Sequence, residues 1–344
     1  MGSGGGSMRK IVVSDGSPLI ANGDEPRFDQ ANRVLIEVRY SAISPGTELQ
    51  LLRNPLVPNG FELGYSASGQ VMEVGEGVTT LKKGDYVACY GGPYVYHAER
   101  LSVPETLCVR LSSEKWLKPA AFIGPGAVAI HSLRRLNLQF GEIVWVVGLG
   151  LLGQLIARLA LNSNYQVFAT DQNAGRCNLA RAIGISNVCI ADDLLSIDMA
   201  INKLTDQHGV DAILLCAHSQ KVGIIDYALE RLAFRGKIAV VGNIPMNFSR
   251  ELFFQKEADL VIARAAGPGR YDKQYEDDGV DYPKSYVRWT EGRNMQEFVR
   301  QLESGQLPVH SLITHEFSLP EAHNGYAKLA AEQGSALGVL IRYD

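Results

Sequence analysis

Short apolar runs separated by turn residues fill the first third of the chain. The runs with the clearest β-strand pattern are residues 34–43, 66–75, 85–90 and 107–111. Glycine punctuates this region, at positions 64, 69, 75, 77 and 84. Glycine in such a pattern is expected where strands bend sharply or pass close together. The pattern predicts a small, strongly bent β-barrel with few helices.

The pattern changes near residue 119, and beyond residue 142 strand-like and helix-like segments alternate. The apolar, strand-like runs are residues 143–148, 165–171, 187–191, 210–217, 237–242 and 260–267. The helix-like segments between them are residues 151–163, 176–184, 193–208 and 222–233. Continuous apolar strands joined by amphipathic helices indicate a parallel sheet covered on both faces. The predicted fold class is therefore α/β, with a doubly wound parallel-sheet domain after the β-rich one.

Composition and charge narrow the class of protein further. The 344 residues are 46% hydrophobic and 20% charged, with a net charge of −4, which is typical of a globular chain. No basic field exists to hold nucleic acid or anionic lipid. No signal-peptide pattern appears, and no apolar run reaches the roughly 18 residues of a membrane span. The five cysteines are scattered and never form CxxC. We therefore expect a cytoplasmic protein with no nucleic-acid or membrane partner.

The sharpest motif is Gly148-Leu149-Gly150-Leu151-Leu152-Gly153, which follows a predicted strand and opens a predicted helix. In this context Gly148 permits the tight turn and Gly150 lets the backbone approach a pyrophosphate. Gly153 lets helix and strand pack closely. The helix N-terminus offers free N–H donors and a partial positive charge. The motif predicts a dinucleotide site, to which Leu151 and Leu152 also belong.

An acidic residue indicates which dinucleotide binds. Asp171 ends the next predicted strand, where a carboxylate accepts hydrogen bonds from the ribose hydroxyls and repels a 2′-phosphate. Gln172 follows it, and the nearest cation, Arg176, opens the next helix. We expect NAD rather than NADP. The residues assigned to the cofactor from this part of the chain onwards are Asp171, Gln172, Arg176, Ala217, Gly242 and Asn243.

With a β-barrel first and a dinucleotide-binding unit second, the chain resembles the medium-chain dehydrogenase/reductase superfamily over nearly its whole length. The matching segments are residues 41–49, 62–78, 81–88, 97–107 and 312–329. The sequences ISPGTE and GPGRYDKQYEDDGVDYPKSYVRWTEGRNM are similar, more narrowly, to the dehydrogenase half of bacterial two-domain oxidoreductases. ISPGTE is also similar to bacteriochlorophyllide dehydrogenases. The resemblance implies a GroES-like substrate domain over residues 8–118 and 268–344 and a Rossmann domain over 119–267. Residues 1–7 read as an expression tag.

The resemblance also indicates where a catalytic zinc would be bound. The positions of the metal ligands in zinc-containing relatives hold Ser44, Tyr65 with Ser66, and Gly124 with Pro125. None of these residues supplies the thiolate, imidazole or carboxylate that zinc prefers. The chain therefore resembles the zinc-free branch, and we expect no metal.

Without zinc, a protein group has to hydrogen-bond the reacting oxygen and move its proton. The resemblance places Thr47 and Glu48 on the loop that lines the active site, and Tyr65 at a position of a metal-binding histidine. We assign Thr47, Glu48, Tyr65 and His97 to catalysis and expect Glu48 and Tyr65 beside the nicotinamide. Each has an alternative interpretation: Glu48 as a solvated loop carboxylate, Tyr65 as a packed ring, and His97 as a structural residue.

Residues 267–294 combine arginines with tyrosines and a tryptophan, which is unusual for a surface loop. Guanidinium groups and phenols suit a polyhydroxylated or anionic substrate. We assign Arg270, Tyr271, Trp289 and Arg293 to substrate binding. The alternative is a lid or interface loop held by its own stacked aromatics. In the family that the chain resembles, the preceding strand often joins a dimer-spanning sheet, so we also expect a homodimer.

The function these observations favour is an NAD(H)-dependent, zinc-independent interconversion of a secondary alcohol and a ketone. The substrate would be a small polar molecule of the sugar, cyclitol or secondary-metabolite kind. One alternative is NAD(P)H-dependent reduction of a carbon–carbon double bond, as in enoyl and quinone reductases. Another is a dinucleotide-binding protein without turnover.

Overall fold

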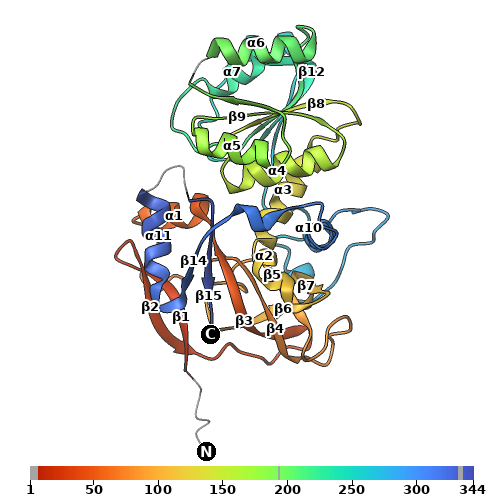
Figure 1. Cartoon of the computed structure of the whole chain (residues 1–344). Coiled ribbons are helices and arrows are strands. Elements are labelled where there is room, and N and C mark those ends of the chain that lie inside the picture. The colour runs from red at the N-terminus through yellow and green to blue at the C-terminus, as the bar shows by residue number, and fades with distance from the viewer. Residues whose placement is uncertain (1–6, 193, 332–335) are drawn as a thin grey trace, which may run out of the picture. The chain divides into compact units, whose positions relative to one another are not determined.

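The computed structural model describes residues 7–192, 194–331 and 336–344, and the chain divides into two compact units (Figure 1). The first unit contains the chain up to Ala127, then Ala266–Gly305 and Val309–Asp344. The second contains Val128–Ala265 and Gln306–Pro308. Of the predicted tag, residues 1–6 lie outside the described residues, and Ser7 opens the first strand.

The first unit is built on a mostly antiparallel sheet with strand order β14-β15-β3-β4-β5-β7, and β6 pairs with β3. Its strands are β3 (Arg33–Ile43), β4 (Ser66–Val74), β5 (Tyr86–Tyr90), β6 (Arg100–Pro104), β7 (Cys108–Leu111), β14 (Ile313–Ser318) and β15 (Gly338–Arg342). A separate hairpin is formed by β1 (Ser7–Ser14) and β2 (Ser17–Asp24). Inward-facing residues at alternate positions of β3, such as Val34, Ile36 and Val38, are buried in one apolar core. Such alternation is typical of a strand that packs one face on a core.

Short helices complete the first unit. They are α1 (Pro45–Arg53), η1 (Glu105–Leu107), η2 (Glu114–Trp116), α2 (Leu117–Ala120), α9 (Lys273–Glu276), α10 (Glu291–Glu303), η3 (Val309–Leu312), η4 (Leu319–Glu321) and α11 (Ala322–Ala331). Helix α3 (Ile123–Arg135) begins in this unit and ends in the second. The expected boundary at residue 119 therefore falls earlier than the one in the structure. The reason lies in β4, where the Ser66 and Ser68 hydroxyls donate to the carbonyl oxygens of Ala121 and Leu117, both at 2.6 Å.

The second unit is the predicted doubly wound domain. Its parallel sheet has the strand order β10-β9-β8-β11-β12-β13. The strands are β8 (Ile143–Val147), β9 (Gln166–Asp171), β10 (Asn187–Ile190), β11 (Val210–Leu215), β12 (Leu232–Val240) and β13 (Asp259–Ile262). The helices are α4 (Leu151–Asn162), α5 (Ala174–Ala182), α6 (Leu194–Thr205), α7 (Ile224–Arg231) and α8 (Arg250–Lys256). Figure 1 shows α4 and α5 on one side of this sheet and α6 and α7 on the other.

The strand order reverses direction between β8 and β11, and ligands of open α/β sheets bind at the carboxyl ends of the strands at such a point. We therefore expect a ligand site at the residues that follow β8, β9, β11 and β12. No helix in the described ranges is long and apolar enough to cross a membrane.

Candidate functional site

The glycine motif of the second unit forms the turn between β8 and α4. Gly148 has a φ of +95°, and a Cβ there would lie 2.9 Å from the backbone nitrogen of Ala217. A Cβ on Gly153 would lie 1.8 Å from the carbonyl oxygen of Gly148, so this helix position tolerates only glycine. A Cβ on Gly150 would meet nothing within 4 Å. The first and third glycines are therefore required by the turn itself, whereas the space above Gly150 is open for a ligand.

The N-terminus of α4 is suited to an anion. Gly150 is its N-cap and provides no side chain to bond the first N–H groups of this 12-residue helix. Unpaired N–H groups and the helix dipole together favour phosphate. An open space above Gly150, next to these donors, is what a pyrophosphate requires, so the residues present fit a dinucleotide.

Asp171, at the end of β9, is tied to this turn. Its Oδ2 accepts a hydrogen bond from the backbone N–H of Leu149 at 2.6 Å, and its Oδ1 accepts one from Asn173 at 2.8 Å. Arg176 approaches the same carboxylate, with 3.6 Å between Nη1 and Oδ2. The site therefore holds a fixed carboxylate with a cation beside it. Gln172 is exposed next to them.

The remaining predicted cofactor residues meet at the same edge of the sheet. Ala217 follows β11 and Gly242 follows β12. A Cβ on Gly242 would lie 2.1 Å from the carbonyl oxygen of Ala217. The carbonyl oxygen of Asn243 accepts a hydrogen bond from the Ser219 N–H at 3.1 Å. Together with the α4 turn, these residues outline one site along the carboxyl ends of β8, β9, β11 and β12.

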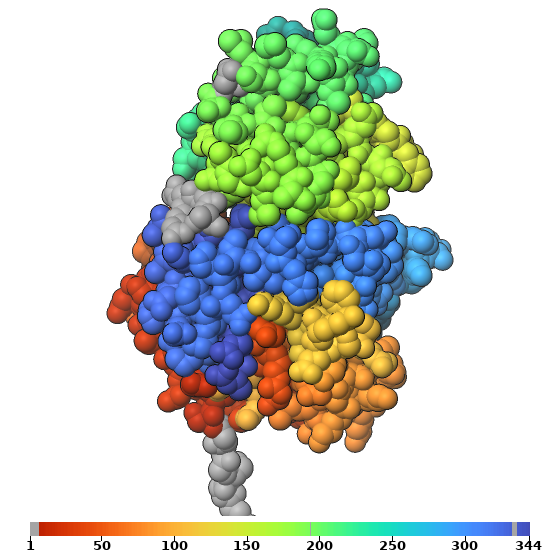
Figure 2. Space-filling view, viewed as in Figure 1, coloured from red at the N-terminus to blue at the C-terminus, as the bar shows by residue number. Residues whose placement is uncertain are grey.

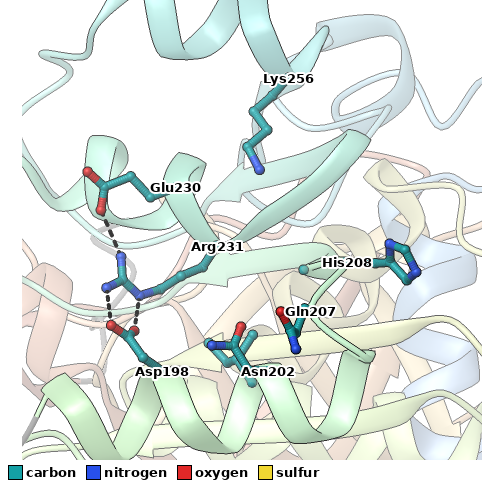
Figure 3. A pocket seen from close by; sticks show the side chains of 9 residues that line it. Asp198, Asn202, Gln207, His208, Glu230, Arg231 and Lys256 are labelled. Atoms are coloured by element: carbon teal, nitrogen blue, oxygen red, sulfur yellow. Dashed lines mark hydrogen bonds and ion pairs between the residues drawn. The ribbon is translucent and has the colours of Figure 1, made fainter.

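A pocket of about 220 Å³ lies elsewhere in the second unit (Figure 3). Gly209 precedes β11 and Arg231 precedes β12, so the pocket is at the amino ends of the strands, opposite the glycine motif. Its main cation is already neutralised, because Arg231 bonds both oxygens of Asp198 and also Glu230 (Figure 3). We therefore do not assign the cofactor to it. Its lining residues are Asp198, Ile201, Asn202, Gln207, His208, Gly209, Glu230, Arg231 and Lys256.

In the first unit the structure brings together the three positions at which the family resemblance would place a zinc site. The Tyr65 hydroxyl donates a hydrogen bond to the Ser44 hydroxyl at 2.8 Å. A Cβ on Gly124 would lie 2.9 Å from the Tyr65 ring, so that ring packs on the start of α3. Burial raises the pKa of the Tyr65 phenol, and hydrogen bonds with Ser44 and with Thr47 oppose this shift. The exposed Thr47 thus extends the hydroxyl cluster towards solvent.

Glu48, which was assigned to catalysis, lies in the interior of the first unit. Its side chain is fully buried, although α1 is a surface helix. One carboxylate oxygen accepts the backbone N–H of Ser44 at 2.7 Å. The other bonds His97 Nε2 at 3.0 Å and accepts the Tyr326 hydroxyl at 2.5 Å. Both oxygens are engaged, so Glu48 holds Ser44 in place rather than presenting a free base.

His97 is likewise internal. It is fully buried, and its Nδ1 lies 2.7 Å from the Ser41 hydroxyl, which in turn lies 2.9 Å from the Tyr343 hydroxyl. Burial and the neighbouring Glu48 carboxylate raise the pKa of Tyr326 well above its ordinary value. The structural interpretation of His97 is thus the one its contacts favour. Ser41, Tyr326 and Tyr343 were not assigned to the site from the sequence, because only the closure of the barrel by β15 and α11 brings Tyr326 and Tyr343 to this cluster.

The aromatic segment between Ala266 and α10 is braced by its own residues. Arg293 donates to the carbonyl oxygen of Val287 at 2.8 Å and to Asp281. The Tyr275 and Tyr282 rings stack with centroids 5.7 Å apart. In Figure 2, α10 and the segment before it form a continuous blue strip on the surface of the first unit.

The substrate residues predicted in this segment fall into two kinds. Arg270 donates to Glu276 and to the carbonyl oxygen of Gly92, so it and Arg293 are occupied within the protein. Tyr271 and Trp289 are instead 57% and 39% exposed. Their rings lie against the guanidinium groups of Arg270 and Arg288, at 4.1 and 5.0 Å. These contacts favour the alternative of a self-supporting loop.

The donor set does not fit zinc. The converging side chains are the hydroxyls of Ser44 and Tyr65 next to Gly124 and Pro125, and none is a thiolate or imidazole. Glu48 and His97, which do carry ligand atoms, are bonded to each other. Throughout the described residues no three His, Cys, Asp or Glu side chains are grouped so that they could hold a metal ion.

Two known protein families match different parts of this chain. The family described as alcohol dehydrogenase GroES-like domain matches residues 30–129, and the family described as zinc-binding dehydrogenase matches residues 148–274. The chain is 27% identical to D-guloside 3-dehydrogenase of Shigella flexneri, over 96% of this chain and 99% of that protein. It is 24% identical to a sorbitol dehydrogenase of Halalkalibacterium halodurans, over 90% of this chain and 91% of that one.

Solved structures show the same fold. Alcohol dehydrogenase from Thermus sp. ATN1 matches with a TM-score of 0.79 and 22% identity, over 98% of this chain and 100% of the other. An alcohol dehydrogenase of Escherichia coli CFT073 complexed with NADH matches with a TM-score of 0.78, 16% identity and coverages of 98% and 100%. A zinc-binding dehydrogenase described from Sinorhizobium meliloti 1021, bound to NADP, matches with a TM-score of 0.75, 17% identity and coverages of 98% and 99%. Fold, paired domains and relatives together support membership of the medium-chain dehydrogenase/reductase superfamily.

Proposed function

We propose that this protein is an NAD(H)-dependent oxidoreductase that interconverts a secondary alcohol and a ketone without a catalytic metal. Its relatives are dehydrogenases of sugars, polyols and alcohols, which supports alcohol and ketone chemistry on a polyhydroxylated substrate. The observation that carries the metal-free part of the proposal is the Tyr65–Ser44 hydrogen bond at the ligand positions of zinc relatives. The five described cysteines are free thiols, in keeping with work in the cytoplasm.

Each unit contributes its own part of the reaction. When bound, the nicotinamide dinucleotide supplies the donor or acceptor of hydride. The N–H groups at the start of α4 hold its pyrophosphate, and Asp171 holds the adenosine ribose. In the first unit, Tyr65 and Ser44 hydrogen-bond the reacting oxygen. Because burial keeps the phenol protonated, Tyr65 donates its proton to the oxygen of a ketone and is reprotonated through Thr47.

A substrate panel tests the reaction class. NADH absorbance would be followed with polyols, sugar nucleotides, cyclitols and enones in both directions, with and without a strong chelator. We expect turnover of a secondary alcohol or its ketone that the chelator leaves unchanged. Turnover of enones alone would instead indicate a double-bond reductase, and tight binding with no turnover a non-catalytic protein. One firmly held zinc per chain, with activity lost to the chelator, would overturn the metal-free mechanism.

Titration with the two reduced dinucleotides tests cofactor choice. We expect NADH to bind more tightly than NADPH, because the Asp171 carboxylate repels a 2′-phosphate. Asp171→Asn should weaken NADH binding by about 1.5–3 kcal/mol, the range for hydrogen bonds to a charged group. Arg176→Gln is the matched variant, because Arg176 lies 3.6 Å from the same carboxylate. Equal or tighter NADPH binding, lost in Arg176→Gln, would show that the arginine decides specificity instead.

A further inference from the structure

Two buried carboxylates flank one guanidinium group in the first unit. Glu276 is 4% exposed, pairs with Arg270 and accepts the backbone N–H of Tyr271 at 3.1 Å. Glu291, the first residue of α10, is fully buried. Among the described residues neither of its carboxylate oxygens accepts a hydrogen bond, and its side-chain hydrogen-bonding neighbour is the second acid, Glu276. If both acids were ionised, one negative charge would be left uncompensated in the interior, which is costly.

A proton on Glu291 removes this cost. The pKa of Glu291 is raised to about 8, mainly by burial and then by the Glu276 carboxylate, while Arg270 opposes this shift. At neutral pH Glu291 is therefore mostly protonated and adds no charge beside the Arg270–Glu276 ion pair.

Phenols are the other ionisable groups that face Glu291, and they do not titrate in this range. Burial raises the pKa of Tyr90 and of Tyr275, the latter to about 12. A hydrogen bond to Asp272 raises the pKa of Tyr282 to about 12. Between pH 5 and 9, a change of charge at this site therefore comes from Glu291.

Arg270 connects the two buried acids with the hydroxyl pair of Tyr65 and Ser44. This arginine also donates to the carbonyl oxygen of Gly92, and its guanidinium carbon lies 5.8 Å from the Tyr90 ring. The Tyr90 ring meets the Tyr65 ring edge-on, with centroids 5.8 Å apart. Arg270 thus joins the aromatic segment, the turn after β5 and the face against which Tyr65 packs.

We propose that Glu291 is a positioning residue whose protonated, neutral form leaves Arg270 on Glu276 and Gly92 and so keeps Tyr90 packed against Tyr65. Once ionised, Glu291 competes for Arg270 and weakens those contacts. The kinetic consequence rests on the proposed function, because it acts through Tyr65. The protonation of Glu291 beside Glu276 and Arg270 does not depend on that function.

Stability as a function of pH tests the protonation of Glu291. The pKa of Glu291 is raised on folding, so its stabilising contribution is complete below its ordinary pKa of 4.5 and is lost as pH rises towards 8. Glu291→Gln carries no titrating proton and should escape this loss. We expect its melting temperature to exceed that of the wild type increasingly from pH 5 to pH 8.5, by about 3 °C or more at the upper end. Glu297→Gln, on the same helix and paired with Arg300, should run parallel to the wild type.

Parallel curves for Glu291→Gln and the wild type would overturn the proposal. Glu276→Gln provides a second test if the first variant fails to fold. It leaves Glu291 as the carboxylate closest to Arg270, so the stability loss should move to lower pH. An unmoved transition would also overturn the proposal.

Kinetics then test the effect on the site. In the wild type the KM for the alcohol or ketone should rise severalfold between pH 7 and pH 9, while NADH binding is unchanged. In Glu291→Gln the KM should stay flat. A flat wild-type profile would overturn the positioning role. Lack of turnover with every substrate would contradict the proposed function and leave the stability result standing.

Discussion

At the scale of single residues, the phenol of Tyr65 stands where zinc relatives place a metal ligand, and its partner is the Ser44 hydroxyl at 2.8 Å. If this pair transfers the proton, Tyr65→Phe should lower kcat by about 10²–10⁴-fold, the usual contribution of a positioned acid or base. NADH binding should change little, because the dinucleotide contacts lie in the second unit. Tyr86→Phe is a matched control, since the Tyr86 hydroxyl makes a long, exposed 3.4 Å contact with Glu114. Equal rates for both variants would rule Tyr65 out as the proton donor.

We expect Glu48 to contribute to the stability of the fold rather than to proton transfer. Its carboxylate accepts or shares three hydrogen bonds in a fully buried place, and an amide of the same shape cannot satisfy all of them. We expect Glu48→Gln to reduce the free energy of unfolding by about 2 kcal/mol. The exposed Glu76→Gln should be nearly neutral in the same urea titration. An unchanged midpoint in Glu48→Gln would contradict this role, and Glu48 would return as a candidate base.

At the scale of elements, an added methyl group should have different effects at two glycines of the turn between β8 and α4. Gly153→Ala would place a Cβ 1.8 Å from the Gly148 carbonyl oxygen, so helix and strand have to move apart. Such overpacking typically costs about 1–3 kcal/mol. Gly150→Ala adds its methyl group to open space at an ordinary φ of −61°, so the fold is preserved.

These two variants therefore make a paired prediction. Gly150→Ala should keep the wild-type melting temperature but weaken NADH binding by about tenfold or more, because its methyl group occupies the space assigned to the pyrophosphate. Gly153→Ala should lose both stability and binding. Calorimetry and NADH fluorescence measure the two quantities. Undiminished binding in Gly150→Ala would mean that the dinucleotide does not approach this turn.

At the scale of the whole molecule, the outer strand β13 points to assembly. It forms one edge of the parallel sheet, and its Ile262 side chain is 59% exposed. Phe254 of the adjacent α8 is 71% exposed. An open edge with exposed apolar side chains is a site for pairing with another chain. We propose that two copies pair along β13 into a homodimer.

Sedimentation velocity tests this assembly. Ile262→Lys should shift the wild-type dimer towards monomer, because a charge would have to be buried between the edges. Met199→Lys is the matched control: Met199 is 72% exposed on α6, in the same unit but away from β13. A monomeric wild type, or a dimer indifferent to Ile262→Lys, would exclude this pairing.

The sequence by itself determined the two-part architecture and the dinucleotide turn, because both are written in local patterns. Strand and helix periodicities repeat every few residues, and the three glycines of residues 148–153 lie on one short loop. The resemblance to zinc-containing relatives, which places Ser44 and Tyr65 at ligand positions, likewise needs no coordinates.

Only the tertiary structure decided how the catalytic and substrate residues are used. Whether Glu48 faces solvent or the interior depends on Tyr326, which is far away along the chain and reaches it through closure of the barrel. Whether Arg270 is free or paired depends on Glu276 and the turn at Gly92. A glutamate or an arginine is the same residue in the sequence whether its side chain is exposed or buried, free or paired. Its chemistry is set by partners and burial, which arise from long-range packing that no local pattern encodes.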